Sequence, residues 1–144
     1  MMMAIAVDKG WCNYDDTVCQ HWPEFAQRGE GKKSEIKICD VMRHEANMEA
    51  LGKCFSFADA YPENIQKNVI GDIIEQSSCW NRPESTRTYH TFTKDMIANE
   101  VFRRVEPNKR TMGQYFKEEI EKQHGLDVYI TMNPEDYPKH YPLR

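Results

Sequence analysis

The sequence lacks the long hydrophobic run that a membrane-spanning helix requires. Its longest apolar stretch, MMMAIAV at residues 1–7, is much shorter than the roughly 20 residues that cross a bilayer. No charged leader precedes this stretch, and Asp8, Lys9 and Gly10 follow it directly. We therefore predict no membrane span and no signal peptide, and we expect a cytoplasmic protein.

Recognisable enzyme motifs are also missing. There is no glycine-rich phosphate loop, no Gly-x-Ser-x-Gly turn that would expose a nucleophilic serine, and no pair of carboxylates at helical spacing on a predicted cleft. Internal repeats, low-complexity runs and long linkers are absent too. We therefore predict one globular domain over residues 1–132, followed by an extended tail rich in proline and tyrosine over residues 133–144, and we predict no cofactor.

The cysteines are few and irregularly spaced, which argues against a disulfide framework. There are five of them, an odd number, at Cys12, Cys19, Cys39, Cys54 and Cys79. Secreted domains held by disulfides usually carry an even number, so we expect reduced and mostly buried thiols inside the cell. The close pairs with which structural zinc sites begin, such as Cys-x2-Cys, are missing as well.

The stretch WCNYDDTVCQHW, residues 11–22, holds the densest group of potential metal ligands. These candidate ligands are Cys12, Cys19 and His21. Zinc needs about four donors that converge, and nothing in the spacing fixes that geometry. A reactive thiol would need a cationic neighbour or a helix N-terminus to activate it, and the sequence places neither nearby. The favoured interpretation is packing, with Cys19 and both tryptophans in the core and His21 at its edge.

The stretch RHEANME, residues 43–49, begins like the zinc-protease motif in which two histidines stand four residues apart. Met48 occupies the position of the second histidine, so one ligand is missing. We therefore interpret His44 and Glu45 as part of the solvated face of a short helix.

Hydrophobic periodicity predicts a mixture of helices and strands. Strands are expected at residues 2–7, 35–41, 86–92 and 126–132, where apolar residues cluster or alternate. Helices are expected from 42 to 51, from 62 to 74, from 93 to 105 and from 111 to 125, the last with a capping box of Thr111 and Gln114. This order of elements favours an α+β fold in which three or four helices pack on a small mixed β-sheet, with a mainly helical fold as the alternative.

Positive charge is concentrated in one segment, although the net charge of the chain is −4. Residues 82–110 contain seven lysines and arginines against four acids, with aromatic residues between them. The residues predicted to contact a partner are Arg82, Arg87, Tyr89, Arg103, Arg104, Lys109, Arg110, Tyr137 and Tyr141. Arginine and aromatic side chains are favoured at the centres of protein interfaces, although a plain solvated helix face is the simpler role for Arg103 and Arg104.

Three functions follow from these observations. The favoured hypothesis is a small soluble accessory or regulatory protein that acts by binding another protein, with a virus or a mobile element as a candidate origin. A single-stranded nucleic-acid-binding protein is the second, because such proteins combine cations for the phosphates with aromatic rings for the bases. The third is a small enzyme or zinc protein built on Cys12, Cys19 and His21. In the enzyme version the site is assembled from distant residues, and His44 and His90 are further candidates beside Cys19 and His21. The sequence leaves catalysis and the oligomeric state open.

Overall fold

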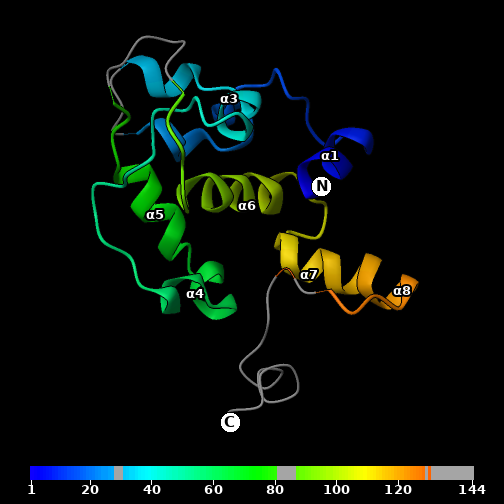
Figure 1. The fold of residues 1–144 in the computed structure, drawn as a ribbon. Coiled ribbons are helices and arrows are strands. Elements are labelled where there is room, and N and C mark those ends of the chain that lie inside the picture. Colours follow the sequence, from blue (N-terminus) through cyan, green and yellow to red (C-terminus); the bar gives the residue numbers. More distant parts are fainter. Residues whose placement is uncertain (28–30, 81–86, 129, 131–144) are drawn as a thin grey trace.

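Helix α6 (Thr93–Val105) lies at the centre of the computed structural model, with other helices packed around it (Figure 1). Its apolar residues recur every three or four positions, so Ile97, Val101 and Phe102 are all buried in the core. The helices in contact with it are α1 (Met2–Asp8), α2 (Val18–His21), α3 (Ile38–Met42), α5 (Val69–Gln76) and α7 (Met112–Phe116). The core of the described residues therefore forms around one long helix, and segments far apart in the sequence meet on it.

The structure describes residues 1–27, 31–80, 87–128 and 130. Its remaining elements are α4 (Pro62–Gln66), α8 (Lys122–His124), the 3-10 turns η1 (Pro23–Ala26), η2 (Gly31–Glu35) and η3 (Phe57–Ala60), and the π-helical stretch η4 (Lys117–Glu121). In this part of the chain, no helix combines the length and the apolar character needed to cross a bilayer. The predicted tail, residues 133–144, lies outside the described residues, so the predicted single-domain boundary stays a prediction.

The predicted mixed sheet is wrong, and the described residues match the mainly helical alternative. The run at residues 2–7 is not a strand but helix α1, which buries Met2, Met3 and Ala6. Methionine and alanine are good helix formers, and the run is too short for periodicity to separate a strand from a buried helix.

The other predicted strands are also missing from the described residues. Residues 35–41 supply one partner, Lys37, of an isolated antiparallel bridge to Thr17, and then enter α3. The described parts of the last two, residues 87–92, 126–128 and 130, contain no strand. Alternation of apolar and polar residues describes a strand's two faces, but it cannot supply the neighbouring strand that a stable sheet requires.

Two of the predicted helices are confirmed. Helix α6 agrees with the prediction to within one residue, because Thr93, which was expected to cap it, is its first helical residue. Helices α7 and α8, with η4 between them, cover the helix predicted from 111 to 125. At its start, Gln114 N–H donates to Thr111 Oγ1 at 3.2 Å and Thr111 N–H donates to Gln114 Oε1 at 2.9 Å, which is the predicted capping box. At its end, Gly125 adopts the left-handed conformation with φ 62°, as expected of a helix-terminating glycine.

The other two predicted helices are interrupted by residues with positive φ. Of the helix predicted from 42 to 51, only Met42 is helical, and it is the last residue of α3. His44 (φ 65°) and Asn47 (φ 53°) adopt left-handed conformations that prevent the helix from continuing. The helix predicted from Pro62 is divided into α4 and α5 at Asn68, which has φ 62°. A left-handed residue ends a right-handed helix, and neither break leaves a mark on the spacing of apolar residues.

A buried lysine joins η2 to the C-terminal end of α5. The Lys33 ammonium donates to the backbone carbonyl oxygens of Ile74 at 2.6 Å, Glu75 at 3.2 Å and Ser77 at 2.6 Å, and it lies 4.8 Å from the centroid of the Phe25 ring. The last carbonyl groups of a helix have no partners within the helix, so this cation satisfies groups that burial would otherwise leave bare. Burial lowers the pKa of Lys33 to about 8, although the nearby Cys79, Cys19 and Glu75 oppose this shift and favour the ammonium form.

Arg103 and Arg104 are not on a solvated face, contrary to the simpler sequence interpretation. Both guanidinium groups contact the carboxylate of Glu100, which is 1% exposed, with Arg103 Nε donating to its Oε2 at 2.8 Å. Arg104 also donates to Asn68 Oδ1 at 2.9 Å, and its guanidinium stacks 3.9 Å from the centroid of the Trp22 ring. These two charges are used inside the molecule, and they connect α6 to the break between α4 and α5.

Candidate active site

The segment from 87 to 90, which precedes α6, is held against residues 44–48. Thr88 N–H donates to the backbone carbonyl oxygen of His44 at 3.1 Å. His90 N–H donates to Nδ1 of the same histidine at 3.0 Å. His44 therefore receives hydrogen bonds from the residues on both sides of position 89.

The buried His90 side chain belongs to the same hydrogen-bond network and connects Thr88 to Met48. Its side chain is 1% exposed. Its Nδ1 lies 2.5 Å from the carbonyl oxygen of Thr88, to which it donates, and its Nε2 accepts from Met48 N–H at 3.1 Å. These partners assign the neutral imidazole with its proton on Nδ1, because a carbonyl can only accept and a backbone N–H can only donate.

Tyr89 stands out from this network into solvent. It is 71% exposed, although its backbone is fixed on both sides. Its ring lies against the His44 ring, with centroids 5.0 Å apart and planes tilted by 31°. The result is an accessible phenol on a constrained backbone, and a phenol can donate or accept a proton in a hydrogen bond.

An ion-pair cluster holds the outer end of the segment. Arg87 Nη2 lies 2.7 Å from Glu45 Oε1, and Arg43 Nε lies 2.9 Å from Glu45 Oε2. The hydrogen bond from Arg87, with the positive charge of both arginines, keeps the pKa of Glu45 below its usual value. The segment is therefore anchored at Arg87 as well as at Thr88 and His90.

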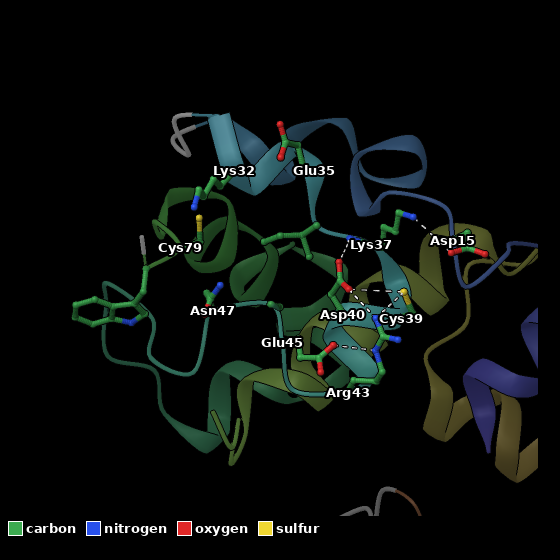
Figure 2. Close-up of a pocket in the computed structure, with 13 residues that line it drawn as sticks. Asp15, Lys32, Glu35, Lys37, Cys39, Asp40, Arg43, Glu45, Asn47 and Cys79 are labelled. Carbon is green, nitrogen blue, oxygen red and sulfur yellow. Dashed lines mark hydrogen bonds and ion pairs between the residues drawn. The ribbon is translucent and has the colours of Figure 1, made fainter. Parts of the chain in front are cut away.

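A cavity of about 360 Å³ adjoins this cluster, and Glu45 belongs to its wall (Figure 2). Its other lining residues are Asp15, Lys32, Glu35, Ile36, Lys37, Cys39, Asp40, Arg43, Ala46, Asn47, Cys79 and Trp80. Two ion pairs lie within the wall, with Arg43 Nη2 3.2 Å from Asp40 Oδ1 and Lys37 Nζ 3.5 Å from Asp15 Oδ1. Asn47 Oδ1 is buried and has no hydrogen-bond partner among the described residues.

The structure separates the residues predicted to contact a partner. Arg87 and Tyr89 lie together beside His44, whereas Arg82, Tyr137 and Tyr141 lie outside the described residues. The others gather at and after the end of α6: Arg103 and Arg104 in the Glu100 cluster, Lys109 donating to the Arg104 carbonyl at 2.6 Å, and Arg110 paired with Glu106, Glu118 and Glu119 at 2.8 Å each. The charge of this segment is thus largely taken up by acids of the same chain.

The three candidate metal ligands do not converge. His21 Nε2 is 2.8 Å from Asp16 Oδ2, and Cys12 is 3% exposed, with burial raising the pKa of its thiol to about 11. Across the described residues, no three cysteine, histidine or carboxylate side chains are placed to hold a metal. The packing interpretation is confirmed for Cys19 and the tryptophans: Trp22 is fully buried, and Trp11 and Cys19 pack against the core.

Comparison with known proteins identifies the family. A sequence model described as Beta-lactamase matches residues 1–139. The chain belongs to the beta-lactamase family. It is 24% identical over 132 residues to Esterase/beta-lactamase LipL of Mycobacterium tuberculosis, a match that covers 91% of this chain and 28% of that protein.

Solved structures of this beta-lactamase-family fold resemble the chain closely. A penicillin-binding protein homologue from Caulobacter crescentus superposes with a TM-score of 0.78 at 26% identity, covering 96% of this chain and 35% of that one. A family VIII carboxylesterase superposes with a TM-score of 0.76 at 24% identity, covering 94% of this chain and 35% of that one. The chain therefore spans about a third of the length of the proteins it matches.

These findings overturn the functional hypotheses drawn from the sequence. A family of hydrolases replaces the accessory or regulatory binding protein, the nucleic-acid-binding protein and the small enzyme or zinc protein built on Cys12, Cys19 and His21. Membership also directs attention to a motif that the sequence interpretation passed over. In penicillin-binding proteins and class A β-lactamases, the nucleophilic serine belongs to a Ser-x-x-Lys motif.

Ser34 and Lys37 match that spacing but not its geometry. Residues three apart face each other on one helical turn. Ser34 lies in η2, whereas Lys37 stands at the start of α3 with an extended backbone (φ −90°, ψ 159°) and pairs with Asp15. The motif is therefore a coincidence of spacing at this place.

His44 is one of the candidates that the sequence offers for an enzyme site, but its contacts are not visible in the sequence. It was expected on a solvated helix face, and it is instead half-buried, with positive φ and two incoming hydrogen bonds. Its partners lie more than 40 residues away, so no local pattern could have found them. Tyr89 is among the residues predicted to contact a partner, but its contact with the His44 ring has no signature in the sequence.

Proposed function

We propose that this chain contributes to the active site of a hydrolase that cleaves esters or β-lactam-type amides, with Tyr89 as a proton-transfer group. Membership of the beta-lactamase family supports the reaction class, and so does the name of the relative LipL, which joins esterase with beta-lactamase. The whole reaction is a proposal, because the chain spans about a third of its relatives.

The observation that carries the proposal is the exposed Tyr89 on its fixed backbone. Acyl transfer to a serine needs a group that removes the proton of the nucleophile and returns one to the leaving group. A positioned phenol can do both, provided that its oxygen is accessible and its location is fixed. Tyr89 meets both conditions, since it is 71% exposed and flanked by hydrogen bonds to His44.

Ser34 is not the nucleophile in this proposal, because its geometry does not bring it to Lys37. We assign the nucleophile to a residue outside those the structure describes. A phosphonate probe that reacts with activated serines, followed by peptide mapping of the labelled protein, identifies that residue. Labelling at Ser34 would contradict this part of the proposal.

The decisive test is Tyr89→Phe in the protein in its complete natural form. Hydrolysis of p-nitrophenyl butyrate and of nitrocefin is measured for the wild type and the variant. Loss of a proton-transfer group is expected to lower kcat by about 10²-fold to 10⁴-fold. Tyr61→Phe is the matched control, because Tyr61 is also exposed, at 46%, and lies at the start of α4. Absence of hydrolysis by the wild type, or equal rates in Tyr89→Phe, would refute the proposal.

The cytoplasm is the compartment we propose, and the thiols support it. All five cysteines are free in the structure, as is usual in a reducing compartment. Fractionation of host cells with a tag on the chain tests this location. A protein partner likewise stays a prediction, for which a pull-down from host lysate is the measurement.

A further inference from the structure

We infer that His44 is a positioning residue that sets the place of the Tyr89 phenol, and that it can do so only as a neutral imidazole. The inference rests on the proposed function, since it concerns the same site. It is carried by three contacts to one residue: the Thr88 N–H on its carbonyl oxygen, the His90 N–H on its Nδ1, and the Tyr89 ring on its ring.

The first step is the backbone of His44. A residue other than glycine or asparagine at φ 65° is strained by about 1 to 2 kcal/mol, and such strain persists where surrounding contacts determine the conformation. Here the carbonyl group and the ring of His44 both point to the 88–90 segment. The left-handed conformation thus lets one residue hold both sides of position 89.

The second step is the protonation state. His44 Nδ1 accepts from the His90 N–H, so it must carry a lone pair. A protonated imidazole donates from both nitrogens and would face that N–H with another proton. Acid therefore removes the bond on the C-terminal side of Tyr89.

The contacts described around His44 offer no replacement acceptor within residues 1–27, 31–80 and 87–128. Its ring neighbours are the Tyr89 and His90 rings. The adjacent carboxylate, Glu45, is engaged by Arg43 and Arg87. His90 is already committed, with Nδ1 donating to Thr88 and Nε2 accepting from Met48. Protonation of His44 is thus expected to release the His90 N–H, while the Thr88 N–H stays bonded to the His44 carbonyl, so that position 89 is held on one side only.

Two substitutions of His44 separate positioning from folding. His44→Asn keeps an acceptor, because the Asn Oδ1 occupies nearly the place of the imidazole Nδ1, tolerates positive φ and cannot be protonated. His44→Gly also tolerates positive φ but has neither the acceptor nor the ring. Thermal unfolding of both variants shows whether they fold like the wild type.

The expected result is a loss of kcat in His44→Gly of about tenfold or more, with KM little changed, since misplacing a reacting group impairs catalysis more than binding. His44→Asn is expected to recover most of kcat. It should also retain that kcat at acidic pH, where the wild type loses activity. Full kcat in the glycine variant, or the same acid loss in both wild type and asparagine variant, would overturn the inference.

A readout without catalysis keeps this inference separate from the proposed function. In the complete chain, the amide proton of His90 is followed by NMR as the pH is lowered. We expect its signal to shift in the wild type as the hydrogen bond to His44 is lost, and to stay in His44→Asn. A His90 signal that does not change with pH in the wild type would refute the positioning role of His44. Unchanged kcat in Tyr89→Phe would refute only the catalytic role of Tyr89.

Discussion

Lys33 illustrates how a single residue can be both costly and necessary. Its ammonium is fully buried, yet it bonds three carbonyl groups that end α5. Removal from water disfavours the charged form of a lysine, which is why the pKa of Lys33 falls to about 8 from the ordinary 10.5. The charge is therefore retained at neutral pH, because the helix end provides acceptors that water would otherwise provide.

The lowered pKa of Lys33 predicts how stability depends on pH. Between pH 8 and 10.5 the unfolded chain binds more protons at this site than the folded one, so the free energy of unfolding rises with pH, by up to about 3 kcal/mol from this group. Below pH 8 the contribution is constant. Urea unfolding of the wild type and of Lys33→Met at pH 7.5 and pH 10 measures the effect. The difference between the two proteins should shift in favour of the wild type at the higher pH, and no shift would contradict the assignment.

The break between α4 and α5 shows how an element can be decided by one side chain. Asn68 turns the chain with φ 62° and uses its amide to bind Asp72 at 2.7 Å and Arg104 at 2.9 Å. The amide packs over Gly71, where a Cβ would lie 2.1 Å from Asn68 Oδ1. Gly71 is unfavourable for a helix by itself, but its missing side chain leaves the space in which the Asn68 amide packs.

Gly71→Ala is expected to destabilise the protein, although alanine is the better helix former by about 1 kcal/mol. Displacing the Asn68 amide from its partners should outweigh that gain and cost about 1 to 3 kcal/mol net. Gly52→Ala serves as the control, because a Cβ there meets Ser77 at an ordinary 3.8 Å. Thermal and urea unfolding of both variants are the measurements, and a stabilised Gly71→Ala would show that Asn68 is not constrained as described.

Local patterns predicted the helices that depend on local contacts. Thr111 and Gln114 are three residues apart, and the apolar spacing of α6 runs through one continuous helix, so both elements were predicted correctly. The breaks at His44 and Asn68 depend on partners far along the chain, such as His90 and Arg104. The arrangement of the site could not be predicted for the same reason, because the position of Tyr89 depends on its contacts with His44.

At the scale of the whole molecule, the Glu100 cluster connects three regions. Arg104 contacts Glu100 on its own helix, Asn68 at the α4–α5 break, and the ring of Trp22 before η1. Trp22 in turn donates from Nε1 to Glu75 Oε1 at 2.8 Å. Because these groups are largely shielded from water, their interactions are stronger than those of surface ion pairs.

Arg104→Met is therefore expected to lower the free energy of unfolding by about 2 kcal/mol, since Glu100 loses one of its two guanidinium partners and the Trp22 ring loses its stacked cation. Arg87→Met is the comparison, because Arg87 is 66% exposed and its pair with Glu45 should contribute less than about 1 kcal/mol. Urea denaturation of both variants gives the two values. Equal losses would mean that the Glu100 cluster adds no more than a surface pair.

The buried position of Lys33 also makes its amine a probe of local opening of the structure. An acylating reagent can reach its nitrogen only when η2 lifts away from the end of α5, whereas Lys53, on the surface, reacts at once. The ratio of the two labelling rates would report how often this corner of the protein opens, with no probe added to it.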